Sequence, residues 1–309
     1  MKLLTYTICA LALVCLAAII SGCKSYKDQK LELADTPDRG RIYVSADESF
    51  KPIIDEHVQV YEANHPGTEI IVDYKPEAEC LKDMIVDSVR VIIATRGFSA
   101  AEKQFIVDSF RLSPRKMVVA RDAVAVIVSP ESEDSLFTMD EIRQILTGKF
   151  KKDLIPVFDG VQATSTVRYI VDSVLKTEEI TPKAVAARTS VGVIDHVAKN
   201  PNAIGFIGVS WIGNKEDEQQ LSFLTKVKMA RIESKPGEEM YYLPMQANIY
   251  YRQYPMIRDL VYILKENYNG LGKGFVDFMS GERGQLIFKR AYLMPAQKDF
   301  RIRPIRVRE

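Results

Sequence analysis

Residues 89–102 read VRVIIATRGFSAAE, and this stretch decides the fold class. Its first seven residues form a largely apolar run that is typical of a buried strand. Ser99 and Glu102 follow at the spacing of a capping box, in which two side chains bond free backbone N–H groups at the start of a helix. The stretch therefore predicts a buried strand that leads directly into a helix.

The same alternation of strand and helix continues on both sides of this stretch. Residues 50–61 repeat apolar side chains at the i, i+3, i+4 spacing of a helix, and residues 138–141 form a second capping box. Residues 116–128 are long for one strand, so they predict either two strands or one strand that passes from a first domain into a second. Residues 224–232 predict a further strand. Such alternation predicts an α/β fold with parallel sheets covered by helices on both faces.

The N-terminus has the order of a secretion signal. Lys2 precedes an apolar run over residues 3–20, and small residues follow directly before Cys23. This ending resembles the lipobox of bacterial lipoproteins, which implies that residues 1–22 are removed and that Cys23 is acylated. The alternative is a transmembrane anchor, for which the run is short because a span needs about 20 apolar residues. Residues 23–39 are polar and predict a flexible tether.

The net charge and the cysteine and histidine content exclude several classes of function. The formal net charge of +1 argues against a broad surface for polyanions, so no nucleic-acid partner is expected. Cys80 is the one cysteine beyond Cys23, so an internal disulfide is not expected. The three histidines lack metal-ligand spacing with a cysteine, and His57 and His65 are expected to be surface residues of one helix. Neither a metal, a cofactor nor a catalytic motif is predicted.

Three predicted strand-to-helix junctions, at residues 45–50, 95–99 and 159–166, carry small hydroxyl side chains. In open α/β sheets, ligands bind at the carboxyl ends of strands, next to helix N-termini. A helix N-terminus offers free N–H groups and partial positive charge to an anion, and an arginine adds a full charge. The alternative is that these hydroxyl residues are ordinary N-caps. The candidate donors to an oxyanion are Ser49, Thr95, Arg96, Ser165 and Thr166.

Several segments, taken together, are specific enough to suggest a family. They are residues 47–50 (DESF), 87–96 (DSVRVIIATR), 145–148 (ILTG), 157–159 (VFD), 165–169 (STVRY), 200–205 (NPNAIG) and 272–285 (GKGFVDFMSGERGQ). They resemble the periplasmic phosphate-binding lipoproteins of the phosphate-specific ABC transporter, in the divergent form common in Bacteroidetes. The resemblance implies a type II periplasmic-binding-protein fold, in which two α/β lobes are joined by two crossover strands with the ligand cleft between them. Lobe one then comprises residues 40–122 plus 244–309, and lobe two comprises residues 123–243.

The resemblance also implies which residues contact the anion. In that family the contacts come from a small-residue loop, a Ser-Asp pair after a strand, and an Arg followed by Ser-Gly-Thr. Ser49 and Phe50 match the first loop, and Thr95 takes the Ser position of the second. Ser165 and Thr166 fall at the third.

Two charges depart from the family pattern. Arg96 stands where the better-known members have an acceptor Asp, and Asp159 stands near where they have Arg. Phosphate at neutral pH still carries a proton, which a carboxylate can accept as a hydrogen bond, whereas sulfate carries none. Phosphate selectivity is therefore expected if Asp159, or alternatively Asp47, points into the site.

The leading hypothesis is a membrane-anchored periplasmic lipoprotein that binds inorganic phosphate or a similar oxyanion. It would act as a monomer, without catalysis, and pass the ion to the permease subunits of an ABC transporter. One alternative is a lipoprotein that senses an anion or displays a binding surface without feeding a transporter. A second is an exported hydrolase, for which the sequence offers no recognisable nucleophile–base pair or metal cluster.

Overall fold

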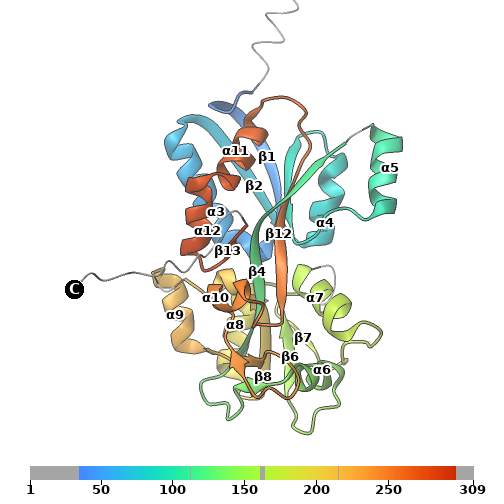
Figure 1. Cartoon of the computed structure of the whole chain (residues 1–309), viewed down its shortest axis with the longest axis vertical. Coiled ribbons are helices and arrows are strands. Elements are labelled where there is room, and N and C mark those ends of the chain that lie inside the picture. The colour runs from blue at the N-terminus through green and yellow to red at the C-terminus, as the bar shows by residue number, and fades with distance from the viewer. Residues whose placement is uncertain (1–34, 112, 161–163, 215, 297–309) are drawn as a thin grey trace, which may run out of the picture.

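The computed structural model describes residues 35–111, 113–160, 164–214 and 216–296, which form two α/β lobes placed end to end (Figure 1). Two strands, β4 (Arg115–Val128) and β12 (Ile257–Leu264), run through the middle of the molecule and connect the lobes. This arrangement confirms the α/β architecture with two crossover strands. It also decides between the two predictions for residues 116–128, because they form one strand that passes from the first lobe into the second.

The main sheet runs through both lobes in the order β2-β1-β3-β12-β4-β8-β6-β7. The first part of β4 pairs with β12, and the part from Val124 onward pairs with β8. Neighbouring strands are parallel among β1, β2 and β3 and among β6, β7 and β8, as predicted. The crossover strands pair antiparallel, because β4 carries the chain out of the first lobe and β12 carries it back. The remaining strands are β1 (Arg39–Asp47), β2 (Gly67–Lys75), β3 (Val89–Ala94), β5 (Leu136–Phe137), β6 (Ile155–Phe158), β7 (Val185–Ala186), β8 (Ala203–Gly208), β9 (Lys228–Met229), β10 (Arg231–Glu233), β11 (Tyr241–Tyr242) and β13 (Met294–Pro295).

The helices begin where the sequence places their caps. Ser99 caps α5 and Thr138 caps α6, each in a complete capping box with the glutamate three residues later. The helix that follows the predicted junction at residues 159–166 begins as α7 and continues as a π-helix, Ile170–Leu175. The α-helices are α3 (Lys51–Asn64), α4 (Glu77–Lys82), α5 (Ala100–Phe110), α6 (Met139–Thr147), α7 (Ser165–Tyr169), α8 (Ser190–Lys199), α9 (Glu218–Lys226), α10 (Gln246–Tyr250), α11 (Leu271–Ser280) and α12 (Glu282–Arg290), and the 3-10 turns are η1 (Glu48–Phe50), η2 (Asp83–Ile85) and η4 (Val209–Trp211).

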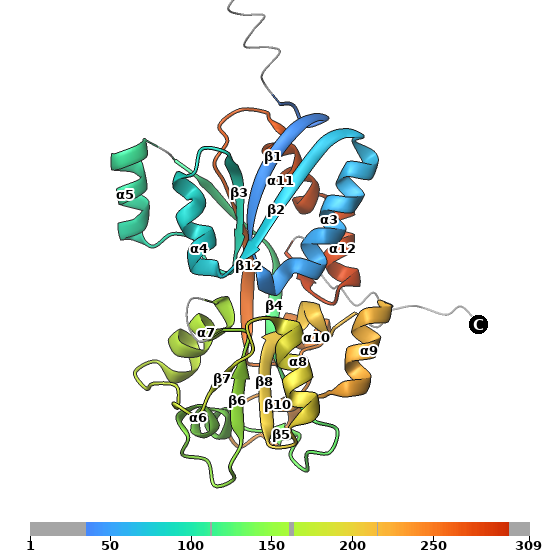
Figure 2. The ribbon, with the colours of Figure 1, turned by 180° about the vertical axis from the view of Figure 1, so that it is seen from behind.

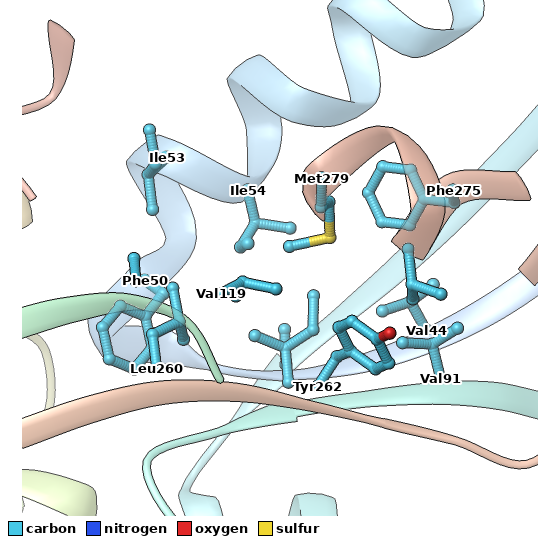
Figure 3. Close-up of a cluster of buried hydrophobic side chains, with 14 of the residues drawn as sticks. Val44, Phe50, Ile53, Ile54, Val91, Val119, Leu260, Tyr262, Phe275 and Met279 are labelled. Atoms are coloured by element: carbon cyan, nitrogen blue, oxygen red, sulfur yellow. The ribbon is translucent and has the colours of Figure 1, made fainter. Parts of the chain in front are cut away.

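Helices cover both faces of the sheet in the first lobe. Helices α3, α11 and α12 lie on one face, and α4 and α5 lie on the other (Figure 2). Strand β3 serves both layers, since Val91 and Ile93 enter the first core cluster while Ile92 and Ala94 enter the second. Figure 3 shows the first of these clusters, in which Phe50 packs beneath α3. The loop after β1 is therefore anchored by a buried aromatic ring.

The second lobe is built in the same way around the end of β4. Val124, Val126 and Val128 pack into one core cluster, and Ala125 and Ile127 pack into another on the opposite face. The first of these clusters also includes residues that precede β12, from α10 and from the segment 254–256. The boundary expected at residue 244 stays a prediction.

One sequence expectation for a strand fails, and other expectations lie outside the described ranges. Residues 224–232 were expected to form a strand, but α9 continues to Lys226 and two short strands follow, because its N-cap Asp217 and buried Phe223 favour a helix. The signal segment 1–22, Cys23 and most of the tether lie outside the described residues, as does the C-terminal segment 297–309. Within the described part of the chain, no helix combines the length and the hydrophobicity that crossing a bilayer requires.

Candidate functional site

The first predicted junction, between β1 and η1, places two candidate residues at the boundary between the lobes. Asp47 ends β1 and caps η1, and its Oδ1 accepts a hydrogen bond from the Ser49 backbone N–H at 3.0 Å. Both side chains are buried. Phe50 is buried in the first-lobe core beside them, so its side chain holds the turn in place.

The third junction, between β6 and α7, faces the first from the other lobe. Thr164 caps α7, and the helix begins with the buried residues Ser165 and Thr166. The Oγ atoms of Ser49 and Ser165 lie 3.2 Å apart, although the residues belong to different lobes. Thr166 donates a long hydrogen bond of 3.4 Å to Oδ2 of Asp159. Residues 161–163 of this loop lie outside the described ranges.

The central charge of the site is Arg258, which the sequence reasoning did not identify. It projects from β12 and is 5% exposed. Its Nε donates to Oδ2 of Asp122 on β4 at 2.8 Å, and its Nη1 donates to Ser165 Oγ at 2.9 Å and to Thr166 Oγ1 at 3.4 Å. The guanidinium carbon also lies 5.2 Å from the ring centre of Phe50. A cation from the crossover strands thus reaches both predicted junctions.

We call this group the interlobe cluster. Four of its buried side-chain atoms have no hydrogen-bond partner among the described residues: Oδ2 of Asp47, Oδ1 of Asp122, Oδ1 of Asp159 and Nη2 of Arg258. Buried polar atoms in native proteins are nearly always paired, so unpaired ones in one place indicate a site for a ligand or an ion. The members of the cluster are Asp47, Ser49, Asp122, Asp159, Ser165, Thr166 and Arg258.

Burial dominates the titration of the carboxyl groups in the cluster. It raises the pKa of Asp47 to about 7, against the opposing charge of Arg258. Burial likewise raises the pKa values of Asp122 and Asp159 above the ordinary range. Burial alone would lower the pKa of Arg258, but Asp122 and Asp47 outweigh it and hold that pKa above its usual value. In this site burial therefore opposes ionisation of the three carboxyl groups, while the permanent charge of Arg258 favours it.

The second predicted junction is placed differently. Thr95 is buried, but its N–H and its hydroxyl both donate to Glu77. Arg96 turns toward its own loop, where Nη1 and Nη2 donate to the two carboxylate oxygens of Glu102 at 2.8 and 3.0 Å. The structure therefore brings together Asp47, Ser49, Asp159, Ser165 and Thr166 but leaves the Arg96 side chain outside the interlobe cluster.

Further contacts hold the lobes against each other. Ser210 donates to the Ser49 carbonyl at 2.7 Å. The carboxylate of Glu48 accepts from the Ser190 hydroxyl at 3.1 Å and from its N–H at 3.4 Å, at the first turn of α8. Burial, together with the nearby charge of Asp159, raises the pKa of Glu48 to about 6. Within the described ranges, no three His, Cys, Asp or Glu side chains are arranged to hold a metal ion.

A weak signal for Arg258 was present in the sequence. Asp122 is the one carboxylate within the largely apolar run of residues 116–128, and Arg258 lies two residues before the apolar run of residues 260–264. A charge in a buried strand needs a partner. An acidic residue in one such segment and a basic residue in the other would have suggested the pair.

The comparisons with known proteins agree with this architecture. A family model described as a PBP superfamily domain matches residues 33–283. The phosphate-binding protein PstS of Borreliella burgdorferi is 19% identical over 284 residues, which cover 87% of this chain and 91% of that protein. A phosphate ABC transporter substrate-binding protein of Clostridium perfringens, solved with bound phosphate, is 20% identical with a TM-score of 0.69 and covers 84% of this chain and 100% of its own. An ABC-type phosphate transport receptor of Vibrio cholerae is 17% identical with a TM-score of 0.60 and covers 82% of this chain and 99% of its own. At these identities, the solved structures establish a shared fold.

Proposed function

Because this chain belongs to the PBP superfamily, we propose that it binds inorganic phosphate between its lobes and delivers the ion to the permease of an ABC transporter. The names of its relatives support phosphate as the ligand. The relatives from Borreliella burgdorferi, Clostridium perfringens and Vibrio cholerae are all described as proteins of phosphate binding or phosphate transport. The lobes would part at the crossover strands to admit the ion and close on it again. We propose reversible binding rather than catalysis.

The observation that carries the proposal is the mixture of unpaired atoms in the interlobe cluster. Nη2 of Arg258 needs an acceptor, whereas the free oxygens of Asp47 and Asp159 need donors when these carboxyl groups are ionised, the form that the charge of Arg258 favours. A fully ionised anion such as sulfate can only accept hydrogen bonds, so it would leave the carboxylates unpaired and repel them. Hydrogen phosphate both accepts and donates, so it suits the two kinds of partner at once.

The proposed contacts combine predicted residues with Arg258. The hydroxyls of Ser49, Ser165 and Thr166 and the guanidinium of Arg258 would donate to the phosphate oxygens. Asp159 on the opposite lobe, or alternatively Asp47, would accept from its proton. Hydrogen bonds to charged groups contribute about 1.5–3 kcal/mol each. Several of them, less the cost of closing the lobes, are consistent with a dissociation constant of roughly 1 μM.

Isothermal titration of the folded protein with phosphate and with sulfate tests the proposal. We expect micromolar binding of phosphate and at least about a hundredfold weaker binding of sulfate, because sulfate offers the buried carboxylates no proton. Binding of neither anion would end the hypothesis. Equal binding of both would remove the role assigned to Asp47 and Asp159.

Arg96 is tested in the same titration. It was predicted as a ligand residue, and in the structure it is paired with Glu102. The Arg96→Ala variant distinguishes the two roles. Unchanged phosphate affinity would assign Arg96 to its loop, whereas a loss of tenfold or more, about 1.4 kcal/mol, would show that it turns toward the ligand.

We further propose that the protein is a periplasmic lipoprotein held on the membrane through acylated Cys23. The sequence before Cys23 and the polar segment that follows support this proposal. Full-length protein expressed in a bacterial host is expected to lose residues 1–22 and to incorporate labelled fatty acid, and Cys23→Ser is expected to prevent both. A wild type that keeps residues 1–22 and takes up no label would point instead to an uncleaved transmembrane anchor.

A further inference from the structure

The carboxylate of Glu77 occupies the donors that the second junction offers. Glu77 is the first residue of α4 and is 1% exposed. Its Oε1 accepts from the Thr95 backbone N–H at 2.7 Å and from Thr95 Oγ1 at 2.6 Å. Two of the donors expected to hold an oxyanion are thus bonded to a carboxylate of the protein itself. This makes Thr95 part of the wall of the site.

Arg168 completes the contact from the other lobe. It projects from α7, and its Nε donates to Oε2 of Glu77 at 2.5 Å while Nη2 donates to Thr95 Oγ1 at 2.6 Å. Burial alone would raise the pKa of Glu77, but the charge of Arg168 and the hydrogen bonds from Thr95 outweigh it and lower that pKa. Glu77 is therefore ionised at neutral pH, and a charged pair crosses the boundary between the lobes.

On its outer side this pair lines an open pocket. The pocket has a volume of about 440 Å³ and is lined by residues of both lobes. Ala78, Val167, Val171 and Ile180 contribute apolar surface to it. A pocket of this size and character suits an organic group of drug-like size or smaller.

On its inner side the pair adjoins the interlobe cluster. Arg168 follows Ser165 and Thr166 by less than one helical turn on α7. The charge of Glu77 is also close enough to Asp47 to act on its titration. Glu77 and Arg168 therefore stand between a buried polar cluster and an open, partly apolar pocket.

We propose that the Glu77–Arg168–Thr95 contact forms a wall between the phosphate site and this pocket. With the wall in place, the closed protein can hold a free oxyanion but not one that carries an organic substituent. The inference rests on the proposed function and adds a determinant of specificity to it. An ester group on the phosphate would have to displace the ion pair and leave Glu77 buried without its cation, which is costly. Free phosphate requires no such displacement.

The test compares inorganic phosphate with phenyl phosphate in titrations of the wild type and of the variant Glu77→Ala/Arg168→Ala. We expect the wild type to bind phenyl phosphate at least about a hundredfold more weakly than phosphate. The reason is that the phenyl group would leave the buried charge of Glu77 without its cation. In the double variant the phenyl group can enter the pocket, so the difference is expected to shrink to about tenfold or less. Asp172→Asn is the matched control, because Asp172 bonds the same arginine at 3.1 Å from the exposed rim. It should leave the discrimination unchanged.

Three outcomes would overturn the wall. One is a wild type that binds phenyl phosphate as tightly as phosphate. Another is a folded double variant that binds phosphate and still rejects phenyl phosphate. The third is a folded double variant that binds neither, which would make the pair part of the binding machinery. Should the double variant not fold, Glu77→Gln/Arg168→Met allows the same comparison, because it removes both charges together and leaves no buried carboxylate without its cation. A wild type that binds neither anion contradicts the proposed function itself.

Discussion

Replacing Arg258 with methionine is expected to abolish phosphate binding and to destabilise the free protein. The guanidinium is the single permanent cation that contacts the interlobe cluster among the described residues, and it bonds Asp122, Ser165 and Thr166. Removing one member of a buried ion pair costs about 3–5 kcal/mol, because the other charge stays buried without a partner. At about 1.4 kcal/mol per tenfold, affinity for phosphate is expected to fall by a factor of 100 or more.

A second variant separates the loss of binding from the loss of stability. Asp122→Asn added to Arg258→Met removes the uncompensated charge, so most of the thermal stability should return. Phosphate binding should stay absent, because no cation faces the anion. Arg121→Met is the matched control, since Arg121 lies next to Asp122 on β4 and makes a 3.6 Å exposed pair with Asp259. The role of Arg258 is contradicted if the double variant binds phosphate with wild-type affinity.

The elements that sequence alone predicts here depend on local chemistry. The capping boxes at Ser99 and Thr138 are decided by side chains three residues apart, and both form as expected. The strand over residues 116–128 is decided by a largely apolar run, which becomes β4. The junctions at Ser49 and Ser165 follow from strands that lead into helices, and the fold brings them within 3.2 Å of each other. Local patterns were thus sufficient for these elements and for two of the three junctions.

The residues that were missed depend on contacts between distant parts of the chain. Asp122 and Arg258 are 136 residues apart, and Glu77 and Arg168 are 91 residues apart. No local spacing links such pairs, so the sequence suggested Arg96 as the cation, although a glutamate six residues away neutralises it. His57 was also misjudged, because it is fully buried between α3 and the Gly284 carbonyl. A histidine on a helix gives no sign of which helix will pack against it.

Asp47 is expected to make the ligand-free protein less stable as the pH rises. Its pKa is raised from 3.8 to about 7 in the folded state, because burial disfavours the charged form. The folded state therefore binds a proton more tightly than the unfolded chain, so stability falls between about pH 4 and pH 7 and levels off above that range. A pKa difference of this size corresponds to a loss on the order of 4 kcal/mol across the window.

The Asp47→Asn variant tests this expectation. Asparagine still accepts the hydrogen bond from the Ser49 N–H but carries no charge, so the variant should unfold at a higher denaturant concentration than the wild type at pH 8. At pH 4 the two proteins should differ little, because Asp47 is protonated in the folded wild type. Asp73→Asn removes a carboxylate that is 65% exposed on β2 and serves as the control, with no such change expected. Asp122, Asp159 and Glu48 have raised pKa values as well, so some pH dependence should persist in the Asp47 variant. If its denaturation midpoint falls with pH as steeply as that of the wild type, Asp47 is ionised in the folded protein and cannot be the carboxyl that burial holds protonated.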